Sequence, residues 1–343
     1  MQDILGMSYL ELEDFFKSID EPRYRAEQFA QWIYGKKLRD FSDITNFKKE
    51  LKDKLEENAF IYSLKLRSSQ TSKDGTKKYL FALEDGELIE TVLLRQKKEN
   101  EGTRNTLCIS TQVGCPMNCS FCATGQAGFE RDLKTSEIIA QIADVERIEK
   151  LKINNVVFMG MGEPFLNYEN VVRAIKIINE KKFFNIGIRR ITVSTCGLVP
   201  EINRFAEEEL DVVLAVSLHS ADDAKRSSIM PVNRRYNLEE LKKAIAHYIS
   251  KINRRVTLEY AMIRGFNDKP EDLRKLISFC QGLKVHVNLI PINETEEEYK
   301  KSEKAEYFAS ELKKKNIEST VRQERGADID AACGQLKGKG RKH

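Results

Sequence analysis

The first 60 residues carry apolar side chains at helical spacing. The segments YLELEDFFKSI and RAEQFAQWIYGKK place apolar residues three or four positions apart, with polar residues between them. This pattern predicts a small helical domain over residues 1–60.

Residues 61–105 follow a different pattern. The runs KKYLFAL and LIETVLL are short and strand-like, and they flank the turn signal EDG. The charged stretch RQKKENEGTRN then interrupts any periodicity. We expect a small β segment here that ends in a linker or a mobile hairpin loop.

From residue 106 onward, strand-like and helical segments alternate. Six largely apolar runs predict strands: TLCISTQV, INNVVFMG, RRITVST, DVVLAVSLH, RVTLEYAMI and VHVNLIPI. Amphipathic segments such as SEIIAQIADVERIEK, NLEELKKAIAHYISK and PEDLRKLISFC alternate with them. This order predicts a parallel α/β architecture with both faces of the sheet covered. We expect a partial (β/α)6 barrel over residues 106–336 rather than a closed eight-stranded barrel, followed by a basic, flexible tail at 337–343.

The composition is globular and the charge is nearly balanced. The 343 residues include 57 basic and 53 acidic side chains, and the net charge of +4 neither requires nor excludes a nucleic-acid partner. The acidic start MQDILGMSYLELEDFF does not resemble a signal peptide, and no apolar run approaches the roughly 18 residues of a membrane span. We therefore expect a cytoplasmic protein whose clustered cysteines serve metal or redox chemistry.

Three of the seven cysteines fall within CPMNCSFC, residues 115–122. Thiolates are the usual ligands of iron–sulfur clusters, which normally take four. Cys115, Cys119 and Cys122 can hold three irons of a cubane and leave the fourth iron open to a substrate or cofactor. A structural zinc site or a conventional cluster does not explain the missing ligand. The spacing resembles the radical S-adenosylmethionine (SAM) superfamily, which implies a partial (β/α)6 fold and an open iron that chelates SAM.

Polar residues at the ends of the later strands fit the same cofactor. In MGMGEP, Gly162 lets the backbone approach a neighbour closely, and Glu163 can receive an ammonium group. The motifs STCG, SLHS and IPIN end three further strands, and the carboxyl ends of parallel strands meet at one rim. The candidate cofactor contacts are Gly162, Glu163, Ser194, Ser217, Leu218, His219 and Asn293.

Cys108 and Cys333 lie outside the motif. Cys108 falls in the first core strand, where a small buried residue is the ordinary interpretation. Cys333 lies in RGADIDAACGQL, a polar loop poorly suited to core packing. We interpret Cys280, on an amphipathic helix, and Cys196 as structural.

The stretch from Glu90 to Leu336 resembles the RlmN/Cfr family of radical SAM RNA methyltransferases. QVGCPMNCSFCATG, FMGMGEP, SLHS and RGADIDAACGQL occur in the family's order. FMGMGEPFLNYENV and VRQERGADIDAACGQL are more similar to the branch that methylates carbon 2 of an adenine in 23S rRNA and some tRNAs than to the carbon-8 branch. The resemblance implies one [4Fe-4S] cluster with three cysteine ligands and two SAM molecules per turnover.

The resemblance also implies roles for three catalytic residues. Cys333 would accept a methyl group from the first SAM, and a radical made from the second SAM would remove a hydrogen from that methyl group. The carbon would then join the adenine, Glu90 would accept the proton from the ring, and Cys108 would attack Cys333 to release the RNA and form a disulfide. From its local pattern alone, Glu90 is expected to be an exposed strand carboxylate.

The implied partners are 23S rRNA, with tRNA open as a second substrate, and an electron donor such as flavodoxin or ferredoxin. Residues 1–60 resemble the family's RNA-binding accessory domain, and the arginine pairs at 189–190, 234–235 and 254–255 are candidate phosphate contacts near the rim. We expect a monomer. Two alternatives stay open: methylation of carbon 8, and a non-catalytic iron–sulfur RNA-binding module, which would leave Cys108 and Cys333 without a role.

Overall fold

The computed structural model describes residues 1–98, 102–292 and 299–336. Its N-terminal part is a group of short helices closed by a two-residue strand pair. A capping box at Ser8, in which Ser8 and Glu11 each bind the other's backbone amide, starts the first helix. The elements are β1 (Gln2–Asp3), α1 (Tyr9–Ser18), α2 (Tyr24–Ala30), η1 (Gln31–Gly35), η2 (Phe41–Asp43), α3 (Lys49–Asn58) and β2 (Ala59–Phe60).

A ten-stranded sheet forms the rest of the scaffold, in the order β14-β13-β12-β11-β10-β9-β6-β5-β4-β3. The strands from β6 to β14 are parallel, and β3, β4 and β5 extend the sheet in antiparallel fashion. The strands are β3 (Lys65–Thr71), β4 (Lys77–Ala82), β5 (Leu88–Lys98), β6 (Gly102–Cys108), β9 (Asn155–Phe158), β10 (Ile191–Thr195), β11 (Val213–Ser217), β12 (Val256–Met262), β13 (Val285–Pro291) and β14 (Glu318–Val321). A separate pair, β7 (Gln112–Gly114) and β8 (Phe129–Asp132), frames the cysteine motif.

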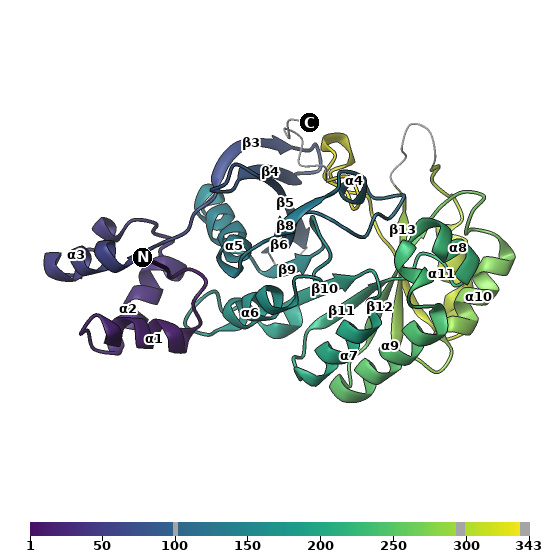
Figure 1. Ribbon diagram of the computed structural model, residues 1–343. Coiled ribbons are helices and arrows are strands. Elements are labelled where there is room, and N and C mark those ends of the chain that lie inside the picture. Colours follow the sequence, from purple (N-terminus) through teal and green to yellow (C-terminus); the bar gives the residue numbers. More distant parts are fainter. Residues whose placement is uncertain (99–101, 293–298, 337–343) are drawn as a thin grey trace.

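Helices connect the parallel strands and cover the sheet (Figure 1). They are α4 (Ala123–Gln126), α5 (Thr135–Glu149), α6 (Tyr168–Asn179), α7 (Val199–Glu207), α8 (Asp223–Ile229), η4 (Pro231–Arg234), α9 (Leu238–Ile252), α10 (Pro270–Cys280) and α11 (Ala305–Lys314). Helix α5 is buried over most of its length because the N-terminal helices cover its outer side. The expected mixed α/β fold with a partial barrel is confirmed.

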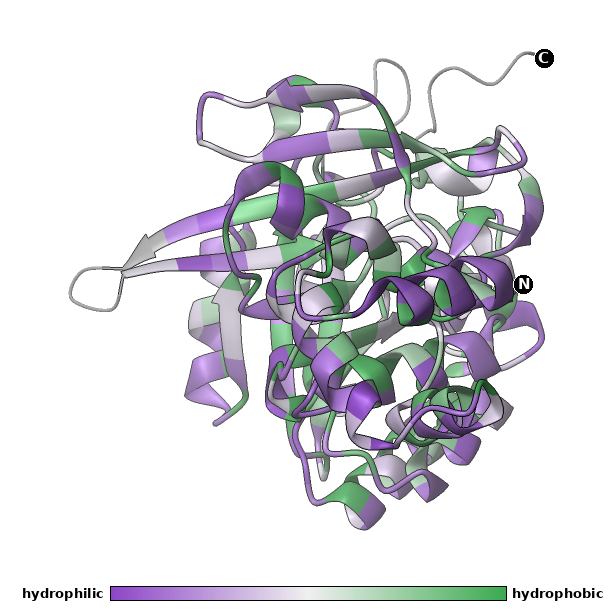
Figure 2. Cartoon of the chain, turned by 90° about the vertical axis from the view of Figure 1, so that its left-hand side faces the viewer, coloured by the Kyte–Doolittle hydropathy of each residue, from purple (hydrophilic) through white to green (hydrophobic). Residues whose placement is uncertain are grey.

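Two features differ from the sequence-based expectation. Strand β14 adds a seventh parallel strand, which the short polar run ESTV did not signal. Most of residues 95–105 form strand rather than linker, because β5 and β6 pair in register from Val92–Cys108 out to Lys98–Gly102. The resulting β5–β6 hairpin projects from the molecule and is largely hydrophilic toward its tip (Figure 2).

Ion pairs to α5 fix the N-terminal helices on the barrel. Lys37 pairs with Glu146, and Arg39 pairs with Asp144 at 3.3 Å. The backbone amide of Leu64 donates to the same Asp144 carboxylate at 2.9 Å. Lys37 and Arg39, two basic residues of the N-terminal part that resembles an RNA-binding domain, therefore hold the two parts of the chain together.

No helix in the described part of the chain has both the length and the apolar character needed to cross a lipid bilayer.

Candidate active site

The cysteine motif forms a loop between β7 and α4, at the carboxyl end of the parallel strands. The amide of Cys115 donates to Gly128 O at 2.8 Å, and the amide of Ser120 donates to Ile229 O, at the end of α8, at 3.1 Å. Gly114 has a φ of +78°, and a Cβ atom there would lie 1.9 Å from Gly128 O, so only glycine allows β7 and β8 to approach this closely. The loop is therefore held from both sides.

A cavity of about 200 Å³, here called the motif cavity, lies over this loop. All three motif cysteines line it, and the remaining wall comes from the carboxyl ends of β9 to β13 and from the C-terminal loop. The lining includes Cys115, Cys119, Cys122, Gly162, Glu163, Ser194, Cys196, Ser217, His219, Glu259, Arg322 and Cys333. The structure thus brings five of the seven candidate cofactor contacts to the cysteine motif.

The three motif thiols lie together in the wall of the motif cavity. Burial raises the pKa of the Cys115 thiol to about 12 and also raises that of Cys119, so both favour the thiol form unless a cation is bound. Within the described residues, no three His, Cys, Asp or Glu side chains are gathered tightly enough to hold one metal ion. Thiolates that bind separate corners of a cluster can lie farther apart.

Glu163 is a buried carboxylate in the wall of the motif cavity. Its oxygens accept hydrogen bonds from the amides of Phe165 at 3.1 Å and Cys196 at 2.8 Å. Burial raises the pKa of Glu163, and these hydrogen bonds oppose that shift. A carboxylate held in this way can receive the ammonium group of an amino-acid ligand.

Close packing against Gln112 requires a glycine at position 162. Its φ is +105°, and a Cβ atom would lie 2.6 Å from Cβ of Gln112. The side chain of Gln112 in turn accepts from the amide of Glu163 at 2.8 Å. Gly162 therefore allows β7 to pack against the turn that carries Glu163.

His219 is a neutral side chain of the cavity wall. Burial, and secondarily Arg226, lowers its pKa to about 3. Its Nδ1 accepts from the amide of Ala261 at 3.0 Å, which places the proton on Nε2. The ring lies edge-on to Phe121 of the cysteine loop, with centroids 4.8 Å apart.

The other predicted contacts differ in position. Ser194 and Ser217 line the motif cavity at the ends of β10 and β11. Leu218 is fully buried and is not part of the lining; its backbone carbonyl accepts from Arg226 at 3.1 Å. Asn293 lies outside the described residues.

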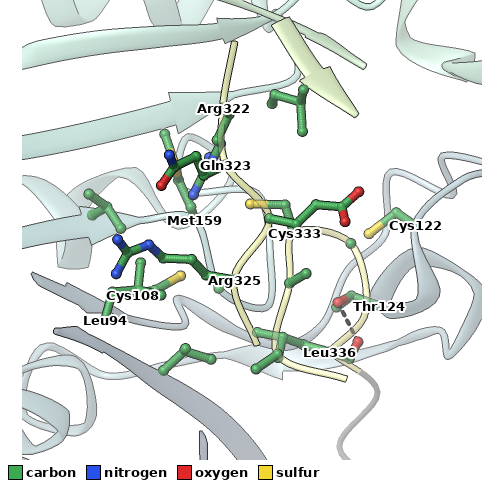
Figure 3. A pocket seen from close by; sticks show the side chains of 18 of the residues that line it. Leu94, Cys108, Cys122, Thr124, Met159, Arg322, Gln323, Arg325, Cys333 and Leu336 are labelled. Carbon is green, nitrogen blue, oxygen red and sulfur yellow. Dashed lines mark hydrogen bonds between the residues drawn. The ribbon is translucent and has the colours of Figure 1, made fainter. Parts of the chain in front are cut away.

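A second cavity, of about 140 Å³, adjoins the first and is here called the thiol cavity (Figure 3). Cys108, at the end of β6, and Cys333, on the C-terminal loop, both line it. Burial raises the pKa of Cys108 to about 12, and Arg322 opposes this shift. Cys333 and Arg322 line both cavities, so Cys333 stands where the two cavities meet. The seven cysteines of the chain are all free thiols.

Glu90 is buried, and the expectation of an exposed strand carboxylate is wrong. It is 2% exposed, lies on β5, and forms an ion pair with Lys78 at 3.2 Å. The next residue on the same face of β5, Val92, lines the thiol cavity, whereas Glu90 itself is not among the lining residues. The C-terminal loop covers this face through Asp330, and local alternation could not reveal that.

Two arginines of the site were not predicted from the sequence. Arg226 is fully buried and donates to the backbone carbonyls of Cys196 and Ser217 at 2.7 and 2.9 Å, which ties together the ends of β10 and β11. Negative charge on Cys333 raises the pKa of Arg322, with Glu259 and Cys108 adding to the shift. The motif VRQERGADIDAACGQL contains Arg322, but its contacts become visible only in the fold. Cys196 lines the motif cavity, and Cys280 is buried on α10.

The arginine pairs do not share one rim, contrary to expectation. Arg189 and Arg190 directly precede β10, and residues 254–255 directly precede β12, so these pairs lie at the amino ends of the strands, away from the cavities. Arg189 binds Asp211 there at 3.1 Å. Arg234 and Arg235, by contrast, are exposed and follow Met230, which lines the motif cavity.

Comparisons with known proteins agree with this geometry. The model of the radical SAM superfamily matches residues 109–279, and that of the ribosomal RNA large subunit methyltransferase N-terminal domain matches residues 2–61. A protein of Thermotoga sp. (strain RQ2) named "Probable dual-specificity RNA methyltransferase RlmN" is 48% identical over 98% of each chain. A relative of the same name from Staphylococcus saprophyticus is 44% identical and covers 99% of this chain and 94% of its own.

A solved structure extends the agreement to the fold. The crystal structure of a radical SAM methyltransferase from Sphaerobacter thermophilus superimposes with a TM-score of 0.92 at 41% identity, over 99% of this chain and all of the other. Membership of the radical SAM superfamily implies a [4Fe-4S] cluster and SAM as cofactors. The chain belongs to the RlmN family of radical SAM RNA methyltransferases.

Proposed function

We propose that this enzyme methylates carbon 2 of an adenine in 23S rRNA, and in tRNA, through a methylated Cys333 and a transient covalent link to the RNA. One observation carries the proposal: Cys333 lines both the motif cavity and the thiol cavity, while Cys108 lines only the second. A cysteine that takes a methyl group on one side and delivers it to a base on the other needs this placement.

The motif cavity supports a site for the cluster and SAM. Cys115, Cys119 and Cys122 would hold the cluster, Glu163 would receive the amino group of SAM, and the polar strand ends would contact the rest. When bound, the two cofactors would supply the methyl group and the one-electron chemistry that activates it. Their electrons would come from an external donor such as flavodoxin or ferredoxin.

The residues of the thiol cavity support the remaining steps, together with Glu90, which lies on the same face of β5 as the cavity-lining Val92. The Cys333 thiolate would accept the methyl group, whose carbon then bonds to carbon 2 of the adenine. Glu90 would accept the proton that leaves carbon 2, and the Cys108 thiolate would attack the sulfur of Cys333. A Cys108–Cys333 disulfide would form as the sulfur–carbon bond breaks. The electron pair of that bond would stay on the carbon, which lost one hydrogen to the radical before it bonded to the adenine, and a proton taken up there would complete the methyl group. Arg322 would favour the Cys108 thiolate, because its positive charge lies beside that sulfur.

The surroundings of the thiol cavity suit an extruded base. Gln323 and Arg325 line this cavity and also line two open hollows beside the β5–β6 hairpin, so the cavity continues to the surface. The adenine must leave its stack to enter, which favours a loop in the RNA over a duplex interior. An RNA substrate and free thiols are consistent with a cytoplasmic enzyme that acts as a monomer.

Nucleoside analysis tests the proposal directly. Anaerobically reconstituted enzyme, with SAM and a reductant, should convert an unmodified 23S rRNA transcript to one that contains 2-methyladenosine, and Cys333→Ala should give none. Product with 8-methyladenosine would instead identify the carbon-8 reaction. Intact SAM and unmodified RNA would favour the non-catalytic iron–sulfur module.

A further inference from the structure

The loop that carries Cys333 is anchored on its N-terminal side by the turn between β3 and β4. The amide of Gly326 donates to the Asp74 carboxylate at 2.9 Å, and the amide of Lys73 donates to the Asp328 carboxylate at 3.2 Å. Gly326 has a φ of +66°, and a Cβ atom there would lie 2.9 Å from Thr76. The turn and the loop are therefore closely packed.

A second anchor holds the other side of Cys333. The amide of Ala123 donates to Gly334 O at 2.7 Å, and the hydroxyl of Thr124 donates to Leu336 O at 2.7 Å (Figure 3). Both donors belong to α4, which directly follows the motif cysteines. The loop of Cys333 is thus held by hydrogen bonds on both sides, to α4 after the cysteine motif and to the β3–β4 turn of the antiparallel part of the sheet.

Lys78 lies within the first anchor and also reaches Glu90. Its Nζ is 3.2 Å from Oε1 of Glu90 and donates to the backbone carbonyl of Asp330 at 3.1 Å. The side chains of Lys78 and Glu90 are both more than nine-tenths buried. One ammonium group therefore joins the carboxylate of β5 to the loop of Cys333, three residues before the cysteine.

The strand register places the side chains of Lys78 and Glu90 on the sheet face that borders the thiol cavity. Lys78 on β4 faces Val92 on β5, and Glu90 is two residues away from Val92, so all three side chains project from the same face of the sheet. Val92 lines the thiol cavity. The neighbouring Lys77 projects from the opposite face and binds Glu149 of α5 at 2.8 Å.

We propose that Lys78 is a positioning residue for the methyl transfer, which holds the Glu90 carboxylate on the face of β5 that borders the thiol cavity and fixes the Cys333 loop relative to it. This inference rests on the proposed function, in which Glu90 accepts the proton from carbon 2. When Glu90 becomes protonated, its attraction to Lys78 falls, while the hydrogen bond to the Asp330 carbonyl is retained. Proton uptake and the position of the Cys333 loop are thereby linked through one side chain.

Lys78→Met tests the proposal, because it removes the charge and keeps most of the side-chain volume. Lys77→Met is the matched control, and Lys78→Arg is the conservative variant. Each holoenzyme is incubated with SAM, a reductant and an unmodified 23S rRNA transcript on which the wild type is active. Cys333 methylation, the covalent RNA–protein adduct and the released product are then measured between pH 6 and 9.

We expect Lys78→Met to load iron and methylate Cys333 within a few-fold of the wild type, since the Asp74, Ala123 and Thr124 contacts remain. Release of product should fall at least 10-fold, with accumulation of the adduct. Because Lys78 Nζ joins the Glu90 carboxylate to the Asp330 carbonyl, its loss should slow adduct resolution without a matching loss of Cys333 methylation. Lys77→Met should behave as the wild type does, and Lys78→Arg should recover most of the activity.

Two results would overturn the inference. One is normal resolution of the adduct by Lys78→Met. The other is a loss of iron and of Cys333 methylation in step with product, which would indicate a structural role alone. Glu90→Gln separates this inference from the proposed function: if that variant also resolves the adduct normally, the assignment of Glu90 fails, whatever Lys78 does.

Discussion

The two adjoining cavities are built in different ways. The motif cavity is formed mainly by the cysteine loop and by successive strand ends of the parallel sheet, so its residues follow a regular order along the chain. The thiol cavity shares the ends of β9 and β13 with the motif cavity, but its other walls come mainly from β5, from the end of β6 and from a loop more than 200 residues later. The proposed cofactor site would therefore sit in the regular geometry of the barrel, while the proposed substrate-specific chemistry would depend on an added antiparallel edge and a C-terminal loop.

The largest effect should come from the motif cysteines. Replacing Cys115, Cys119 or Cys122 with Ala should abolish iron binding and reductive cleavage of SAM, because a cubane held by three thiolates cannot lose one and remain stable. Iron content, the visible absorption spectrum and 5′-deoxyadenosine release measure this. Cys280→Ala, in a buried position on α10, is the control and should keep its iron. If a motif variant retains iron and SAM cleavage, the first cavity is not a cluster site.

Glu163→Gln should weaken SAM binding roughly 10- to 100-fold, the range expected when a charged hydrogen bond to an ammonium group is lost. Isothermal titration of the anaerobic protein measures the change. Glu169→Gln, an exposed carboxylate that pairs with Arg204, should bind SAM normally. Unchanged affinity in Glu163→Gln would remove this residue from the cofactor site.

RNA binding should distinguish the two ends of the barrel. The double substitution Arg234→Gln and Arg235→Gln should lower RNA affinity by about 3- to 10-fold and flatten the salt dependence, as expected for lost phosphate contacts. Arg189→Gln, at the opposite end, should have little effect because Asp211 already binds this arginine. Fluorescence anisotropy at several salt concentrations measures both. A larger effect from Arg189→Gln would indicate that the RNA binds at the amino ends of the strands, away from the cavities.

The smallest effect concerns acid stability. His219 titrates near pH 3 in the folded protein and near 6.5 when unfolded, so the unfolded state binds the additional proton between these values. The contribution of His219 to stability is therefore complete above about pH 6.5 and falls by up to about 1.4 kcal/mol per unit as the pH decreases. His219→Asn, which keeps an acceptor for the amide of Ala261, should lose this part of the pH dependence in denaturant titrations. An identical pH dependence in both proteins would show that His219 is not buried in its neutral form.

The sequence predicts the motif cavity well because its chemistry is local. The three cysteines lie within eight residues, and Glu163, Ser194 and Ser217 were found from the rule that parallel strands end at one rim. These residues of the motif cavity can be predicted without knowing how distant segments of the chain pack.

The thiol cavity could not be predicted from local pattern. The local sequence pattern predicts an exposed Glu90, because nothing near this residue in the sequence indicates the C-terminal loop that covers it. Lys78 and Asp330 are 252 residues apart, and their contact exists only after β4 and the C-terminal loop have packed together. For Cys108 and Cys333, the resemblance to a family supplied a pairing that spacing alone could not supply.

The central claim is that Cys333 carries the methyl group between the two cavities and that Cys108 releases it. Mass spectrometry of Cys108→Ala after reaction with RNA and nuclease digestion tests this most directly. The account predicts a nucleotide covalently attached to the peptide that contains Cys333, while Cys333→Ala shows neither methylation nor adduct. Normal methylated RNA from Cys108→Ala, with no trapped nucleotide, would contradict it.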